Sequence, residues 1–124
     1  MRKTLFIIAT FITVYSCENT PICSGVISHQ VKIVDSTGKA IKLDTFYIIC
    51  ITYPDTLRIK KYIPDSVQNY PLLDDTESSV FKKEKSANFK FIGIKGKDTI
   101  TSPYTFAYDG CHITLVSGVS KIIH

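Results

Sequence analysis

Residues 31–43 read Val-Lys-Ile-Val-Asp-Ser-Thr-Gly-Lys-Ala-Ile-Lys-Leu, with apolar and polar side chains alternating on both sides of a Gly-containing turn. Alternation of period two places the apolar side chains on one face of a strand and the polar ones on the other. Two such runs joined by a short turn with Asp and Gly are typical of a β-hairpin. The stretch therefore predicts strands over 31–34 and 40–43 and a turn over 35–38.

Strand patterns continue along most of the chain. Residues 45–53 are apolar on both faces, with Phe46, Ile48 and Cys50 on one of them. This predicts a central strand that is covered on both sides or borders a contact surface. Further strands are expected over 56–63, 89–93, 104–108 and 111–116, with an extra edge strand over 119–123. About seven short strands separated by frequent turns predict an all-β fold, a single antiparallel β-sandwich of the Ig-like or transthyretin-like kind.

Residues 64–79 form the longest stretch without a strand pattern, and a single helical turn is the only regular structure expected there. A long irregular connection in a compact domain is either functional or mobile. Its tyrosine and carboxylates make it the candidate ligand-contact surface, with Tyr70, Asp74, Asp75 and Glu77 as the contact residues. The competing interpretation is a solvated acidic loop, because the ligand spacing and the Gly of a calcium loop are absent.

The amino terminus carries the pattern of an export signal. Arg2 and Lys3 precede the mostly apolar residues 5–14, too short a stretch for a membrane-spanning helix of about 20 residues. Val14-Tyr15-Ser16-Cys17 resembles the lipobox of bacterial lipoproteins. The resemblance implies cleavage before Cys17, diacylglycerol on its thiol and acylation of its freed amine. We therefore expect a helical signal peptide over 1–16, a lipidated tether over 17–24 and a β-sandwich domain over 25–124.

Processing would change both the charge and the cysteine count. The 124 residues carry 15 basic and 11 acidic side chains, and removal of Arg2 and Lys3 leaves 13 − 11 = +2. This charge gives no reason to expect a nucleic-acid partner. With Cys17 acylated, Cys23, Cys50 and Cys111 remain in a compartment where disulfides persist. Cys50 lies in an apolar run, so we favour a Cys23–Cys111 bridge, and the other pairings stay open.

No motif of a catalytic site is present. The chain lacks a nucleophile elbow, a zinc-protease helix motif and a phosphate loop, so we expect neither an enzyme nor a cofactor. Asp109, Cys111 and His112 offer groups that suit zinc, but their spacing matches no standard pair of ligands on a strand. We interpret them as a turn Asp, a disulfide Cys and a strand His, and predict no metal site.

Two further segments resemble known proteins. The hairpin over 31–41 resembles the opening of carboxypeptidase-regulatory-like (transthyretin-like) sandwich domains. Residues 104–118, with Asp109-Gly110-Cys111-His112-Ile113, look like the end of small Gram-negative envelope lipoproteins of unassigned activity. The resemblance implies a small lipoprotein that carries a sandwich domain.

These features together predict a lipid-anchored accessory protein of the bacterial cell envelope, attached through Cys17, with the outer membrane as the expected location and its periplasmic or surface side left open. The expected role is non-catalytic, either structural or binding, with another envelope protein or a glycan as the partner. The alternatives are a glycan- or peptide-binding surface lipoprotein of an uptake system, or an enzyme with an unrecognised site. A set of six lysines has two interpretations: the lysines bind anionic lipid headgroups, or they lie on solvent-exposed strand edges. The set comprises Lys82, Lys83, Lys85, Lys90, Lys95 and Lys97.

Overall fold

The computed structural model describes residues 23–53, 57–60, 69–82 and 84–124. The expected signal peptide and lipobox, and residues 64–68 of the expected loop, lie outside this range. The described elements, in chain order, are β1 (Ser28–Val34), β2 (Thr45–Cys50), β3 (Leu57–Lys60), β4 (Tyr70–Asp74), the 3-10 helix η1 (Asp75–Phe81), β5 (Ser86–Lys95), β6 (Asp98–Tyr108), β7 (Ile113–Ser117) and β8 (Lys121–Ile123).

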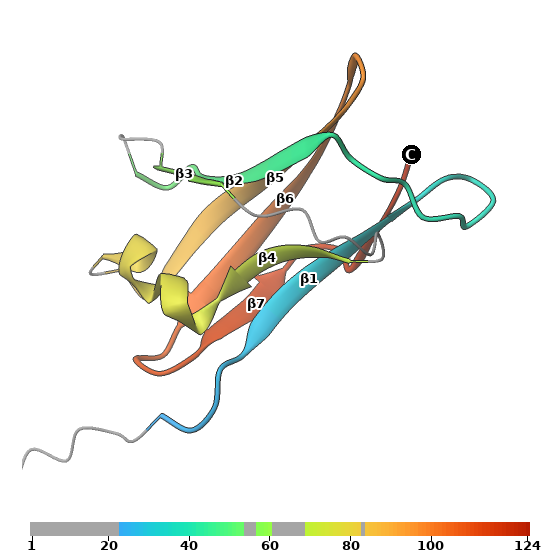
Figure 1. Ribbon diagram of the computed structural model, residues 1–124. Coiled ribbons are helices and arrows are strands. Elements are labelled where there is room, and N and C mark those ends of the chain that lie inside the picture. Colours follow the sequence, from blue (N-terminus) through green and yellow to red (C-terminus); the bar gives the residue numbers. More distant parts are fainter. Residues whose placement is uncertain (1–22, 54–56, 61–68, 83) are drawn as a thin grey trace, which may run out of the picture.

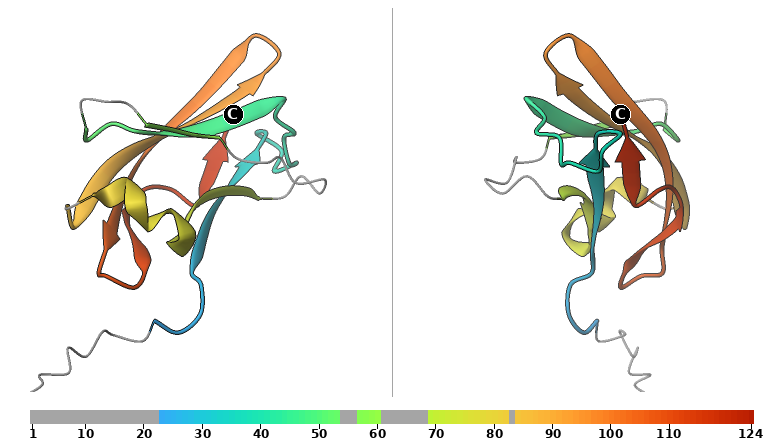
Figure 2. Two further views of the ribbon diagram at one scale, coloured as in Figure 1. Left: turned by 60° about the vertical axis from the view of Figure 1, so that its left-hand side comes forward. Right: turned by 90° about the vertical axis from the view of Figure 1, so that its right-hand side faces the viewer.

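The strands form two sheets that face each other (Figures 1 and 2). The larger sheet has the order β3-β2-β5-β6-β7, and the smaller one has the order β4-β1-β8. All neighbouring strands are antiparallel except β1 and β8, which are parallel. The expected all-β sandwich is confirmed, with one parallel pair that the pattern did not predict.

The core lies between the sheets and follows from the period-two patterns. On β5 the buried residues alternate with exposed or half-buried ones, and Phe91 pairs with Ile48 of β2. The rings of Phe46 and Phe91 lie 5.7 Å apart. Phe46, Ile48 and Cys50 of β2 are buried, whereas Tyr47 on its other face is half-buried. The described strand is therefore covered fully on one face and partly on the other.

The predicted hairpin is correct in its first strand and its turn, and wrong in its second strand. The Asp35 carboxylate accepts hydrogen bonds from the Thr37 and Lys39 amides, each at 2.9 Å, and stabilises the turn. Beyond it, the pairing is limited to one bridge between Val34 and Ala40 and a bond from the Ile41 amide to the Ile33 carbonyl. The second side of the hairpin does not continue as a strand because β4 pairs with the same edge of β1 at residues 28–31.

The prediction of an irregular segment is wrong at β4, which was not expected, whereas η1 lies where a helical turn was expected. Pro71 is tolerated in β4 because this strand is an edge strand, where one side of the backbone needs no donor. The helix η1 starts with a capping box in which the Asp74 carboxylate accepts from the Thr76 amide and the Glu77 carboxylate accepts from the Asp74 amide. The Asp-x-x-Glu spacing is a known helix-start signal.

The end of the described chain passes from one sheet to the other. β7 pairs with β6, and β8 then pairs with β1, which confirms the extra edge strand. Gly118 is needed between them because the Cβ of any other residue at this position would lie 2.2 Å from the Tyr104 ring. The Tyr104 hydroxyl donates to the Val119 carbonyl at 2.8 Å.

Candidate functional site

A disulfide joins the start of the described chain to the turn before β7. The bridge links Cys23 to Cys111, with a Cα–Cα distance of 5.2 Å, across 88 residues of sequence. Cys50 is free and buried in the core. Both findings agree with the pairing that we favoured.

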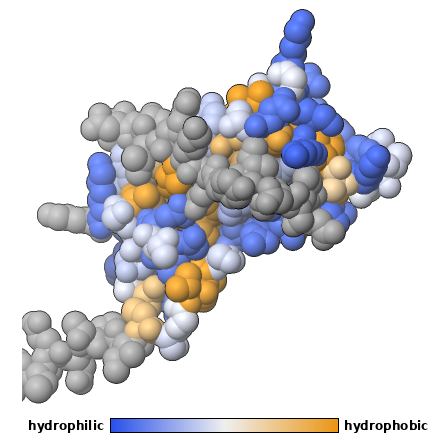
Figure 3. Space-filling model, in the orientation of Figure 1, coloured by the Kyte–Doolittle hydropathy of each residue, from blue (hydrophilic) through white to orange (hydrophobic). Residues whose placement is uncertain are grey.

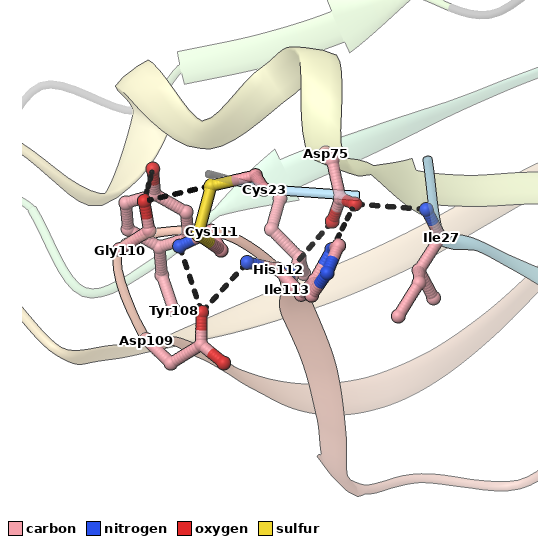
Figure 4. Close-up of a disulfide and its surroundings, with 9 residues drawn as sticks. All are labelled: Cys23, Ile27, Asp75, Tyr108, Asp109, Gly110, Cys111, His112 and Ile113. Atoms are coloured by element: carbon pink, nitrogen blue, oxygen red, sulfur yellow. Dashed lines mark hydrogen bonds and ion pairs between the residues drawn. A yellow bond between two sulfur atoms is a disulfide. The ribbon is translucent and has the colours of Figure 1, made fainter. Parts of the chain in front are cut away.

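The turn that carries Cys111 is held by its own side chains (Figure 4). The Asp109 carboxylate accepts hydrogen bonds from the amides of Cys111 at 2.8 Å and His112 at 2.7 Å. These bonds lower the pKa of Asp109 below its usual value. The Tyr108 hydroxyl donates to the Gly110 carbonyl at 2.9 Å. Asp109 is thus a turn residue, as the sequence indicated.

Asp75 connects three segments that are distant in sequence (Figure 4). Its carboxylate accepts from the Ile27 amide at 2.8 Å and from the Ile113 amide at 2.7 Å. It also contacts Nδ1 of His112 at 2.7 Å. The bonds from Ile27, His112 and Ile113, in that order, lower the pKa of Asp75 from 3.8 to about 2. The carboxylate is therefore ionised over the ordinary pH range and fastens the N-terminal segment and β7 to η1.

The pair of Asp75 and His112 was missed from the sequence, where His112 was compared with its neighbour Asp109. The two residues are 37 positions apart and meet because η1 and the start of β7 lie at the same end of the sandwich. The side chain of His112 is 22% exposed and that of Asp75 is 9% exposed. A carboxylate that orients an imidazole is one part of a hydrolytic triad. Here the same carboxylate also accepts hydrogen bonds from two backbone amides, so it stabilises the fold of the chain.

The other expected contact residues do not converge on one surface. Tyr70 is 1% exposed, and its hydroxyl accepts from the Leu43 amide and donates to the Ile41 carbonyl, both at 2.8 Å. Tyr70 is therefore a core residue rather than a surface residue. Asp74 and Glu77 lie at the start of η1, where they form the capping box.

His29 is a second residue whose role was not apparent from the sequence. Its Nε2 lies 2.7 Å from the Ile113 carbonyl oxygen, and its ring lies 5.3 Å from that of Phe106. His29 on β1 and Asp75 at the start of η1 thus bind both backbone polar groups of Ile113, on the side away from β6. Only the three-dimensional fold brings these residues together.

Two shallow hollows lie at opposite ends of the sandwich. The first is lined by Lys82, Glu84, Lys85, Tyr108, Asp109 and Gly110 with Ala107, beside the disulfide. The second is lined by Asp35, Lys39, Ala40, Ile41, Asp44, Lys95, Gly96, Lys97, Asp98 and His124. The structure therefore separates the described members of the lysine-rich set instead of gathering them in one patch.

Within the described ranges, no group of three or more His, Cys, Asp and Glu side chains is arranged to hold a metal ion. The same residues contain no helix that is long and apolar enough to span a membrane. Comparison with protein-family models, curated proteins and solved structures found no match to this chain.

Proposed function

We propose that this protein is a lipid-anchored accessory protein of the bacterial cell envelope that acts as a non-catalytic binding or structural module. The observation that carries the proposal is the sequence Val14-Tyr15-Ser16-Cys17, followed closely by a cysteine that forms a disulfide with Cys111. Disulfides form and persist in exported proteins and are reduced in the cytosol. The bridge therefore supports the export that the lipobox implies.

The proposed anchor is the acylated Cys17, which becomes the first residue after cleavage. A single acyl chain gives marginal membrane binding, whereas two or three anchor a protein stably. The resemblance to Gram-negative envelope lipoproteins favours the outer membrane. The membrane is thus the first partner in the proposal.

The non-catalytic role is supported by the way the polar groups are used. The Tyr70 hydroxyl binds the backbone of residues 41 and 43 inside the core. The Asp75 carboxylate fastens two backbone amides, and Asp74 and Glu77 cap η1. Each of these groups stabilises the fold, which is what a scaffold requires.

A second candidate function, pairing of a sheet edge with a strand of another envelope protein, is favoured by β7. Leu115, Val116 and Val119 are exposed, and residues 113–120 carry no charge. Edge strands normally discourage pairing with charged residues or Pro. A photo-crosslinker at position 116, compared with exposed Thr99, tests this candidate; equal labelling at both positions would count against it.

The anchor is tested by growing cells with an alkyne analogue of palmitate. We expect label on the unaltered protein, none on Cys17→Ala, and full label on Cys50→Ala, which removes a thiol that takes no part in anchoring. Mass spectrometry of the N-terminal peptide identifies the first residue. Label on Cys17→Ala, or a mature chain that begins at another residue, would refute the lipoprotein assignment.

A further inference from the structure

The disulfide limits how far the sandwich extends from an anchor at Cys17. Six residue steps separate Cys17 from Cys23. A fully extended chain covers about 3.3–3.6 Å per residue, so this stretch spans at most about 22 Å. If Cys17 carries the acyl chains, as proposed above, Cys23 stays within that distance of the membrane.

Residues 23–27 add no further length because they are fastened at both ends. Cys23 is bonded to Cys111. The Ile27 amide donates to the Asp75 carboxylate at 2.8 Å, and the Asp75 amide donates to the Ile27 carbonyl at 3.2 Å. The tether therefore ends at Cys23 and not at the start of β1.

The fastened segment lies at one end of the long axis of the sandwich. Figures 1 and 2 show residues 23–27, the turn between β6 and β7, and η1 at this end. The β5–β6 turn, the turn over 35–38 and the C-terminal residue lie at the other end. A short tether thus brings one particular end of the molecule to the membrane.

The surface chemistry of the fastened end suits a bilayer interface. Val26 is 66% exposed and Ile27 is 41% exposed. Figure 3 shows apolar atoms at this end, close to where the grey N-terminal residues leave the described chain. The adjoining hollow is lined by two lysines and two acidic residues, so its formal charges balance. Apolar contact, rather than attraction to anionic lipid, is therefore the dominant interaction available.

We infer that Val26 and Ile27, with the turn between β6 and β7, form a membrane-contact face that rests on the bilayer interface. The Cys23–Cys111 bridge and Asp75 hold this face in a fixed orientation toward the membrane. The opposite end, with the β5–β6 turn, projects away from the bilayer and presents its surface to other molecules.

The absence of Trp from the sequence gives a direct test. Val26→Trp places a fluorophore on the contact face, and Ser36→Trp, at an exposed turn position, places one at the far end. Each acylated full-length protein is reconstituted in phosphatidylcholine vesicles with brominated acyl chains. We expect about a twofold loss of fluorescence at position 26 and almost none at 36, because interfacial groups sit about 5–10 Å into the headgroup–acyl boundary.

Two measurements distinguish failure of the proposed orientation from failure of the proposed anchor. Flotation with vesicles, compared with Cys17→Ala, reports anchoring alone. Flotation with equal or no quenching at the two positions would overturn the orientation and leave the anchor standing. Failure of the unaltered protein to float would overturn the anchor. Quenching at position 26 that appears only when anionic phosphatidylglycerol is added would also refute the contact face, because it would assign binding to the lysines.

Discussion

Replacing Tyr70 with phenylalanine removes one hydroxyl group from the core and leaves the ring in place. That hydroxyl is the partner of the Leu43 amide and the Ile41 carbonyl, each at 2.8 Å. Ile41 and Leu43 are both buried, although the residues from 41 to 43 belong to no strand. The hydroxyl therefore supplies hydrogen bonds that a sheet would otherwise provide.

The expected cost follows from the two backbone groups left without partners. A buried donor or acceptor that loses its partner costs about 1–3 kcal/mol, so two of them cost about 2–6 kcal/mol. The variant no longer has to bury a hydroxyl, which offsets part of this loss. We expect a net loss of about 3 kcal/mol in the free energy of unfolding. For a domain of about 100 residues this lowers Tm by about 12–24 °C.

Urea unfolding of a chain that starts at residue 17, with Cys17→Ala to leave it unacylated, measures this loss. We expect a lower midpoint with an unchanged slope. The matched control is Tyr108→Phe, which removes a solvent-accessible hydroxyl bonded to Gly110 and changes stability by less than about 0.5 kcal/mol. A loss below about 1 kcal/mol for Tyr70→Phe would refute the role of this hydroxyl.

Three further changes test other parts of the structure. Replacing both Cys23 and Cys111 with Ser opens a loop of 88 residues and should cost about 4–5 kcal/mol in urea unfolding; an unchanged midpoint would contradict a stabilising bridge. Asp75→Asn should lower stability at neutral pH, and the gap to the unaltered protein should narrow as the pH falls from about 4 to about 2, because the folded pKa is the depressed one. A difference in stability between the two proteins that grows as the pH falls would contradict this prediction. Gly93→Ala places a Cβ 2.6 Å from Leu43 and should cost about 1–3 kcal/mol by calorimetry; a neutral change would mean that Leu43 moves freely.

Local patterns in the sequence were enough to predict most of the fold. Alternating side chains located β5 and β6, and the Asp and Gly of residues 35–38 located the first turn. The disulfide was predictable because Cys23 and Cys111 lie near the ends of elements, whereas Cys50 lies within an apolar strand. Such signals extend over a few residues and can be recognised without knowledge of the tertiary structure.

The errors lie where distant residues decide the outcome. The chain over 40–43 has a strand pattern, but β4 occupies the edge of β1 that it would need. The strand β4 was missed, and the reason that it tolerates Pro71 is its edge position, which depends on the order of strands in the sheet. The contact between Asp75 and His112 has no local pattern at all, since it joins residues 37 positions apart.

The place of β1 between β4 and β8 has a consequence for the order of folding. Lys32 of β1 pairs with Lys121 of β8, 121 − 32 = 89 residues later in the chain. Closing such a long loop before any contact forms is costly in entropy and makes folding slow. The first strand thus completes its ladder only after the last strand has been synthesised. A nascent chain of this sequence therefore cannot complete its smaller sheet until β8 emerges, so the parallel pair of β1 and β8 forms only after nearly all of the chain has been synthesised.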